Sequence, residues 1–350
     1  MKIRSYLIIF ISYSNLLLNN LVNCLHINNL KNNNLILNKI NKNSLIRLNS
    51  NSNLKFVNNK NIFKNKLIGY LKLIRYKNIF PTIYLFLTGA FIVNPNINNL
   101  LLRGKELFYS LSSTLCILMS NMVINDLFDM KLDKINNPLR PLITGDVTLK
   151  EASILLIILL SITEYINIYI LPKNLQKIIH LSLLYTFIYT PILKRIPLIK
   201  NLSCSLVVST SVYVGALSAG ISKNINLLYQ IMSLVFLGSL YNEILLDIHD
   251  HDGDLQHNIY TLSILFGKKI ALSISKFILN VNINLNTLLI LVLGYPYYSF
   301  LFFLLCMPIL NDLFKVYQNY NNKENIMNAV VTSSKQLIFM LLLICLLSMR

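Results

Sequence analysis

Nine long apolar runs constrain this chain more than any other feature. Each is close to 20 residues long and carries few charges, which is the length an α-helix needs to cross the hydrocarbon core of a bilayer. The composition agrees, because the mean hydropathy is +0.55 and only 13% of the residues are charged. The sequence therefore predicts an all-α, polytopic membrane protein. The expected spans are residues 78–95, 105–125, 150–171, 176–192, 202–220, 226–246, 270–294, 296–317 and 333–349.

Basic loops between the runs give the orientation of the spans. Short loops rich in lysine and arginine tend to share one side of a membrane. Such loops stand at residues 60–77, 131–140, 194–200 and 268–269. They precede the first span and follow the second, fourth and sixth spans, so one side of the membrane carries all of them.

The first of two acid-rich windows directly follows the second span. Within it, Asn125, Asp129 and Asp133 recur at every fourth position. If the helix continues past the apolar run, these side chains form one polar stripe along its end. An amide and two carboxylates would then share one face.

The second window, residues 243–254, follows the sixth span and repeats this spacing. Asp247 lies four residues after Glu243, and Asp254 lies four residues after Asp250. Both windows follow even-numbered spans, so the topology places them on the same side of the membrane. Together they hold eight of the 14 acidic residues of the chain, namely Asp126, Asp129, Asp133, Glu243, Asp247, Asp250, Asp252 and Asp254.

Such a concentration of acids, in a chain of net charge +18, calls for a cation. Carboxylates repel one another and are costly to gather near lipid. Oxygen ligands suit Mg²⁺, which binds through one or two carboxylates and leaves its other positions to water and phosphate. Two facing clusters would thus clamp a diphosphate. An ion-coupled transporter is the alternative from another class, but transporters place ionisable residues near mid-span, whereas these lie at span ends.

The first 65 residues differ in kind from the rest. Residues 1–25 join a basic start to a short, broken apolar stretch, which is typical of a signal peptide. Residues 26–65 are basic and rich in asparagine, and no acid precedes Glu106, as in a disordered transit peptide. This two-part leader resembles those of proteins sent to a non-photosynthetic plastid, the apicoplast, with the mitochondrial inner membrane as the alternative. Residues 66–350 form the expected membrane domain.

Other metals and partners are disfavoured. The five cysteines show no metal-ligand spacing, and four of them lie inside apolar runs, so they are expected to be small apolar residues. His249 and His251 flank Asp250, but an oxygen-rich site suits Mg²⁺ better than zinc. Membrane lipids are the expected surroundings and no nucleic acid is expected. The sequence leaves the oligomeric state open.

The windows resemble the motifs of the UbiA superfamily of intramembrane prenyltransferases. The family's first motif, Asn-x-x-x-Asp-x-x-x-Asp, is similar to the stripe that ends at Asp133, and the loop after it matches Asp133–Gly145 nearly throughout. Its second motif, Asp-x-x-Asp-x-x-Gly-Asp followed by Thr-Leu and Phe-Gly, resembles residues 247–267. Residues 189–195 look like the family's intervening loop. The resemblance covers residues 70–350 and implies a UbiA-type bundle with both motifs on one membrane face.

The motifs look most like the homogentisate prenyltransferase, chlorophyll synthase and geranylgeranylglyceryl phosphate prenyltransferase branches. The implied reaction is Mg²⁺-dependent transfer of a prenyl group from a prenyl diphosphate to a lipophilic acceptor, with an aromatic quinone or tocopherol precursor expected first. A glyceryl phosphate, a chlorophyll-like alcohol or haem is the alternative acceptor. Asn242 and Leu246 stand where the ether-lipid branch often has arginine and lysine.

The resemblance also implies roles for individual residues. Tyr189 or a carboxylate would take the proton that the acceptor releases, and an apolar groove would hold the prenyl tail away from water. The implied Mg²⁺ ligands are Asn125, Asp129, Asp133, Asp250 and Asp254. The implied diphosphate-binding residues are Arg75, Arg140 and Lys194. The implied supporting residues are Asp126, Asp247 and Asp252.

Overall fold

The computed structural model describes residues 59–221, 223–256 and 259–349. Residues 60–350 cluster as one compact unit. The expected signal peptide and most of the expected transit segment therefore lie outside the described residues. The first described helix, α2 (Asn59–Leu73), begins before residue 66, so the expected boundary of the membrane domain falls inside a helix.

Eight described helices are long and apolar enough to cross a membrane, and they match the expected spans in order. The remaining expected span, the fourth (residues 176–192), is α9 (Lys173–Tyr189), whose 17 residues lie at the short end of the range for a spanning helix. The last helix begins at Lys323, well before the expected start at residue 333. The eight are α3 (Ile79–Val93, with a short helical turn at Tyr76–Asn78), α5 (Gly104–Phe128), α8 (Leu149–Tyr169), α10 (Ile199–Ala219), α11 (Ile225–His249), α14 (Lys268–Val292), α15 (Pro296–Gln318) and α16 (Lys323–Ser348).

Local sequence signals set several helix ends. Thr148 caps the start of α8, since its hydroxyl accepts from the Glu151 amide while the Glu151 carboxylate accepts from the Thr148 amide. The side chain of Asn322 caps α16 by accepting from two backbone amides of its first turn. Pro296 opens α15, where its missing N–H costs no helical hydrogen bond.

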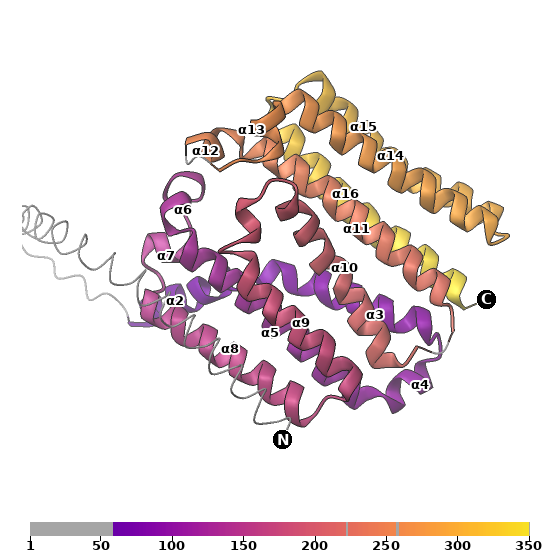
Figure 1. Cartoon of the computed structure of the whole chain (residues 1–350), viewed down its shortest axis with the longest axis horizontal. Coiled ribbons are helices and arrows are strands. Elements are labelled where there is room, and N and C mark those ends of the chain that lie inside the picture. Colours follow the sequence, from indigo (N-terminus) through magenta and orange to yellow (C-terminus); the bar gives the residue numbers. More distant parts are fainter. Residues whose placement is uncertain (1–58, 222, 257–258, 350) are drawn as a thin grey trace, which may run out of the picture. The chain divides into compact units, whose positions relative to one another are not determined.

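Helix α11 holds the centre of the bundle. It packs against α10, α14 and α16, while α10 also packs against α3, and α5 packs against α8 (Figure 1). Tyr241, Ile244 and Leu245 of α11 are fully buried. The short helices α6 (Met130–Asn136), α7 (Pro141–Thr144), α12 (His251–Gln256) and α13 (Leu262–Phe266) lie at one end of the bundle, and α4 (Ile97–Leu102) lies at the other.

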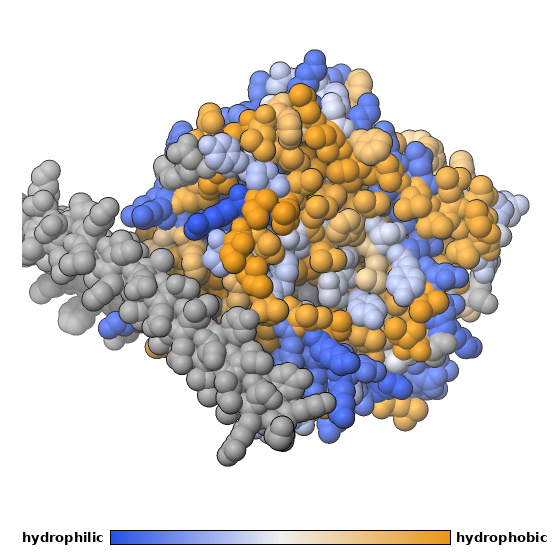
Figure 2. Space-filling view, viewed as in Figure 1, coloured by the Kyte–Doolittle hydropathy of each residue, from blue (hydrophilic) through white to orange (hydrophobic). Residues whose placement is uncertain are grey.

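Apolar side chains cover most of the bundle's outer face in Figure 2, and hydrophilic residues gather mainly at its margins. Large side chains such as Phe277, Phe300 and Phe339 point outward and are more than half exposed. Surfaces of this extent are rare on soluble monomers but are the normal lipid-facing surface of a spanning helix. The chain is an integral membrane protein.

Helices α3 and α10 approach each other closely through two glycines. A Cβ atom added at Gly89 would lie 1.9 Å from the carbonyl oxygen of Val212, and one added at Gly215 would lie 1.9 Å from that of Phe86. Small residues allow such backbone contact between membrane helices. The crossing of α3 and α10 therefore depends on glycine at both positions.

We expect Gly89→Ala and Gly215→Ala to destabilise the protein by about 1–3 kcal/mol or more, because each methyl group would collide with backbone that cannot move aside. Thermal unfolding in detergent measures the effect. Gly104→Ala is the matched control, since a Cβ there meets no atom within 4 Å. Equal unfolding temperatures for all three variants would contradict the close-contact explanation.

Candidate active site

The first acid-rich window spans the junction of α5 and α6. Asp129 stands between the two helices, yet its amide bonds to the Asn125 carbonyl at 2.9 Å, and the Asp133 amide bonds to the Asp129 carbonyl at 2.8 Å. The helical pattern thus continues across the junction, which keeps the expected spacing of the stripe. Lys194, in the loop after α9, donates to Asn125 Oδ1 at 2.9 Å and forms an ion pair with Asp129.

Two arginines gather the other carboxylates of this window. Arg140 pairs with Asp126 and lies 3.2 Å from Asp133, and Arg75 Nη2 lies 3.3 Å from Asp126 Oδ1. Arg75 adopts a left-handed backbone conformation (φ 50°), which is uncommon outside glycine. Asp126 is only 3% exposed and pairs with both guanidinium groups. Asn137 adds a 3.2 Å hydrogen bond to Asp133.

The second window begins inside α11 with a buried ion pair. Asp247 is 2% exposed and pairs with Lys200, while the Asn201 amide donates to its other oxygen at 2.9 Å. The Ser263 hydroxyl also donates to the Asp247 carbonyl at 2.8 Å. With its oxygens held by α10, Asp247 supports the site by joining α10 to α11.

Asp250 and Asp254 lie one helical turn apart beyond the end of α11. Asp250 is exposed and bonds the His249 ring at 2.6 Å, whereas Asp254 is buried. Asp252 points to different partners, because it pairs with Lys268 at 3.3 Å and Lys323 at 3.5 Å, at the starts of α14 and α16. The partners of Asp252 therefore differ from those of the carboxylates around it.

The two windows meet, as the span count predicts. Helix α6 contacts α12, and both Lys194 and Lys200 act electrostatically on Asp254. Burial raises the pKa of Asp133 and that of Asp254 to about 6, against the opposing effect of the nearby Arg140 and Lys200. A bound cation would stabilise the ionised form of these two carboxylates.

The donor atoms of the site fit magnesium bound together with a diphosphate. The converging groups offer amide and carboxylate oxygens, the ligands that Mg²⁺ prefers. Within the described ranges, no three acidic, histidine or cysteine side chains already surround a single point. Lysine and arginine side chains face the carboxylates instead. Mg²⁺ needs only one or two protein carboxylates when phosphate supplies further oxygens, so this arrangement fits an ion that arrives with its substrate.

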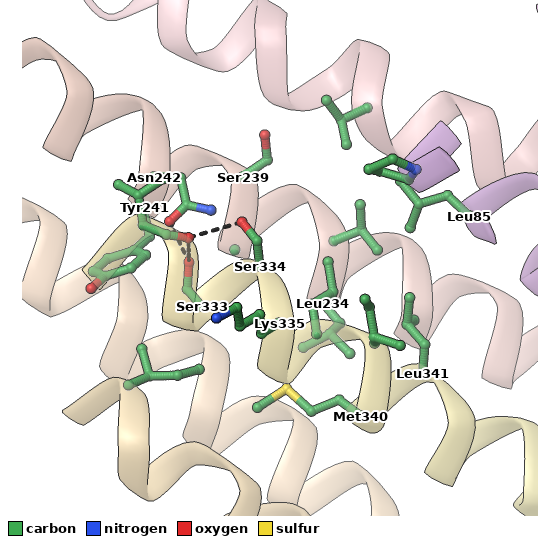
Figure 3. Close-up of a pocket in the computed structure, with 18 of the residues that line it drawn as sticks. Leu85, Leu234, Ser239, Tyr241, Asn242, Ser333, Ser334, Lys335, Met340 and Leu341 are labelled. Atoms are coloured by element: carbon green, nitrogen blue, oxygen red, sulfur yellow. Dashed lines mark hydrogen bonds between the residues drawn. The ribbon is translucent and has the colours of Figure 1, made fainter. Parts of the chain in front are cut away.

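Two mainly apolar cavities lie within the bundle. One of about 570 Å³ is lined chiefly by α3, α11, α14, α15 and α16 (Figure 3), and one of about 420 Å³ lies between α5, α9 and α10. Both are lined by Thr82, Leu85, Leu118 and Val208, so they adjoin each other. Glu243, one helical turn before Asp247, lines the larger cavity. An apolar chamber thus adjoins the charged site.

Tyr189 is not among the residues that line these two cavities. It is buried, its hydroxyl lies 2.8 Å from the Cys204 sulfur, and its ring stacks on Tyr185 at 5.7 Å between ring centres. Tyr185 lines the smaller cavity.

Sequence reasoning missed three residues of the site. Lys200 had no role beyond its charge in a basic loop, Asn201 had none, and Glu243 was grouped with the acids without a function. The signal for Glu243 was its position four residues before Asp247, on the same helical face. Nothing in the local sequence connects Lys200 or Asn201 with Asp247, because their contact joins two helices.

Comparisons with known proteins agree with this geometry. Digeranylgeranylglyceryl phosphate synthase of Methanosphaera stadtmanae is 31% identical over 215 residues, which are 61% of this chain and 76% of that protein. The protein of the same name from Methanocaldococcus jannaschii is 29% identical over 216 residues, 59% of this chain and 71% of that protein.

Solved structures share the fold. A structure of digeranylgeranylglyceryl phosphate synthase in membranes gives a TM-score of 0.63 at 23% identity, covering 81% of this chain and 98% of that one. A UbiA homologue from Archaeoglobus fulgidus bound to GPP and Mg²⁺ gives 0.57 at 16% identity, covering 79% and 99%. The model of the UbiA prenyltransferase family matches residues 82–345, a range that includes both acid-rich windows. The chain is therefore a prenyltransferase that belongs to the UbiA prenyltransferase family.

Proposed function

We propose that this chain transfers a prenyl group from a prenyl diphosphate to the hydroxyl group of a glyceryl phosphate lipid, with Mg²⁺ as cofactor. The observation that carries this proposal is the meeting of two acid-rich helix ends, with their lysines and arginines, beside a large apolar cavity. Such a site combines an anion-binding end with a chamber for isoprenoid chains.

The diphosphate binds where the basic side chains converge. Lys194 turns from Asp129 to a phosphate oxygen as a point charge, while Arg140 and Arg75 stay paired with Asp126 and offer their remaining N–H groups to phosphate oxygens as planar forks. The Mg²⁺ ligands are Asn125, Asp129, Asp133, Asp250 and Asp254. Bound Mg²⁺ neutralises the charge that develops on the departing diphosphate. The protein positions these oxygen atoms and keeps water out of the site.

The cavities hold the apolar parts of both substrates. Their combined lining is dominated by leucine, isoleucine, valine and phenylalanine, so a prenyl chain buries its surface there without losing a hydrogen bond. The same walls exclude water, which would otherwise capture the allylic cation.

The names of the relatives favour a glyceryl phosphate acceptor over the aromatic precursor that was expected first from the sequence. A hydroxyl acceptor uses an oxygen lone pair to bond the prenyl carbon, while the carbon–oxygen bond to diphosphate breaks with its electrons going to diphosphate. The hydroxyl proton must then leave. We propose that Glu243 accepts this proton, because it is the one carboxylate among the described residues that line the larger cavity. Tyr189, the other candidate, is engaged with Cys204.

The test is prenyl transfer by the purified protein in lipid, with several prenyl diphosphates offered against a prenylated glyceryl phosphate, homogentisate and 4-hydroxybenzoate, with and without Mg²⁺. We expect ether-bond formation on the glyceryl phosphate only when Mg²⁺ is present. Preferential prenylation of an aromatic ring would overturn the acceptor assignment. No transfer to any acceptor would overturn the function itself.

We expect Asp129→Asn and Asp250→Asn each to lower kcat by about 10²-fold or more, because each removes a charged ligand of the Mg²⁺ that stabilises the leaving group. Asp252→Asn is the matched control. It lies in the same window but pairs with Lys268 and Lys323, so its kcat should stay within about threefold of wild type. Equal losses of kcat in Asp250→Asn and Asp252→Asn would contradict the inference that the two aspartates have different roles.

Magnesium binding should weaken in acid. Only ionised carboxylates bind the metal, and Asp133 and Asp254 both have a pKa of about 6. They are ionised at pH 7.5 and mostly protonated at pH 5, where affinity falls about tenfold for each group. The rise in unfolding temperature caused by MgCl₂ with inorganic diphosphate should therefore be larger at pH 7.5. The double variant Asp133→Asn/Asp254→Asn should lose this difference; a rise in wild type that is equal at both pH values would contradict the assignment.

We also propose a plastid membrane as the location, on the basis of the two-part leader in residues 1–65, which lies largely outside the described residues. The full chain with a C-terminal tag should co-localise with a plastid marker, and the chain lacking residues 1–58 should not. Co-localisation with a mitochondrial marker would favour the alternative.

A further inference from the structure

A polar cluster interrupts the apolar wall of the larger cavity. It comes from two helices, with Ser239 and Asn242 on α11 and Ser333, Ser334 and Lys335 on α16. The Ser333 hydroxyl donates to Asn242 Oδ1 at 2.6 Å, which fixes the two helices against each other at this level. Asn242 Oδ1 is thus engaged, while its amide nitrogen, a donor, is left for another partner.

Lys335 is the charged member of this cluster, and it is exposed where it lines the cavity. It stands twelve residues into α16, about 18 Å along the helix from Lys323, inside a helix that spans the membrane. In the part of the chain that the structure describes, Lys335 has no acidic partner, whereas Lys323 and Lys315 each pair with an aspartate. Ionisable residues within membrane-spanning helices are rare, usually face a cavity or the bundle interior, and usually serve a function.

The cavity has a polar end and an apolar end. Figure 3 shows Asn242, Ser333, Ser334 and Lys335 together on one side, with Leu85, Leu234 and Leu341 toward the other. This distribution matches an amphiphile whose headgroup is small and anionic and whose tail is a hydrocarbon chain. A purely apolar ligand would leave the lysine unpaired.

The cluster also lies at a suitable distance from the diphosphate site. Asn242 precedes Asp250, the proposed Mg²⁺ ligand at the end of α11, by eight residues, which is about 12 Å along the helix. Glu243 lies between these levels and lines the same cavity. A glycerol unit fits this interval, with its phosphate at the cluster and its free hydroxyl near Glu243 and the departing diphosphate.

We propose that Lys335, together with Ser334 and Asn242, binds the phosphate of the acceptor lipid and so selects phosphorylated acceptors. This inference rests on the proposed function and deepens it. The ammonium group supplies a charged donor and the asparagine amide a neutral one, while the Ser334 hydroxyl turns to the phosphate from the Val330 carbonyl, to which it donates at 2.9 Å. Lys335 thereby provides a positive charge in the cavity whose wall also carries Asn242 and Leu246.

The experiment compares two acceptors that differ only in the phosphate, a prenyl-glyceryl ether phosphate and the same ether without phosphate. Wild type should prefer the phosphorylated ether in kcat/KM. Lys335→Met should raise KM for that ether about 10- to 100-fold, which is the loss expected for a hydrogen bond to a charged group. It should leave KM for the unphosphorylated ether and for the prenyl diphosphate unchanged. Lys335→Arg keeps the charge and should recover most of the preference.

Lys269→Met is the matched control, because it removes an exposed lysine from the start of α14 that does not line the cavity. Its acceptor preference should equal that of wild type. Equal preference in Lys335→Met and wild type would overturn the proposal. So would a loss for both acceptors alike, since that indicates a general defect in the cavity.

A binding measurement separates this proposal from the proposed function. Equilibrium binding of the radiolabelled ether phosphate to the full protein, without any prenyl diphosphate, should weaken about 10- to 100-fold in Lys335→Met. If wild type binds the ether phosphate through Lys335 but does not prenylate it, the proposed function fails and the phosphate site stands. If wild type prenylates it and Lys335→Met binds equally well, the phosphate site fails alone.

Discussion

Pairing of buried carboxylates with basic side chains is the interaction on which this structure depends. Asp126 and Asp247 are almost completely buried, and each would be costly to hold as an isolated charge. Arg75 and Arg140 pair with the first, and Lys200 pairs with the second. Because Arg75 and Arg140 lie in loops that return to α5, and Lys200 of α10 pairs with α11, the charges also hold these segments together. Removing one partner from such a pair typically costs about 3–5 kcal/mol.

This pairing divides the acids into two groups with different tasks. The carboxylate oxygens of Asp126 and Asp247 are bound by basic or amide groups, and these contacts fix the segments around the site. Asp129, Asp250 and Asp254 lie farther along the chain, and in the proposed reaction Lys194 turns from Asp129 to a phosphate oxygen. Part of the binding energy of Mg²⁺ and diphosphate thus relieves charges that the folded protein already brings together. The folded protein thus positions these carboxylates before Mg²⁺ and diphosphate bind.

The apolar half of the protein depends on how closely its helices approach. The glycines at the crossing of α3 and α10 bring the two backbones together, and the Tyr84 hydroxyl ties α3 to the Ile338 carbonyl of α16 at 2.9 Å. These contacts shape a chamber of about 570 Å³ next to the charged site. Its polar wall around Lys335 gives the chamber the two-ended character that an acceptor with a phosphate and a hydrocarbon chain requires.

The sequence by itself determined the order of the spans, the shared side of the two windows, and the motif residues that carry the family, while its count of nine spans exceeds by one the eight candidate spans among the described residues. These depend on run length, basic loops and four-residue spacing, which are local properties of the chain. Only the tertiary structure decided that Lys200 pairs with Asp247, that Asp252 turns to α14 and α16, and that Lys335 faces the cavity. The physical reason is that these contacts join helices distant in sequence, so they depend on how the helices pack and on which face each one turns inward.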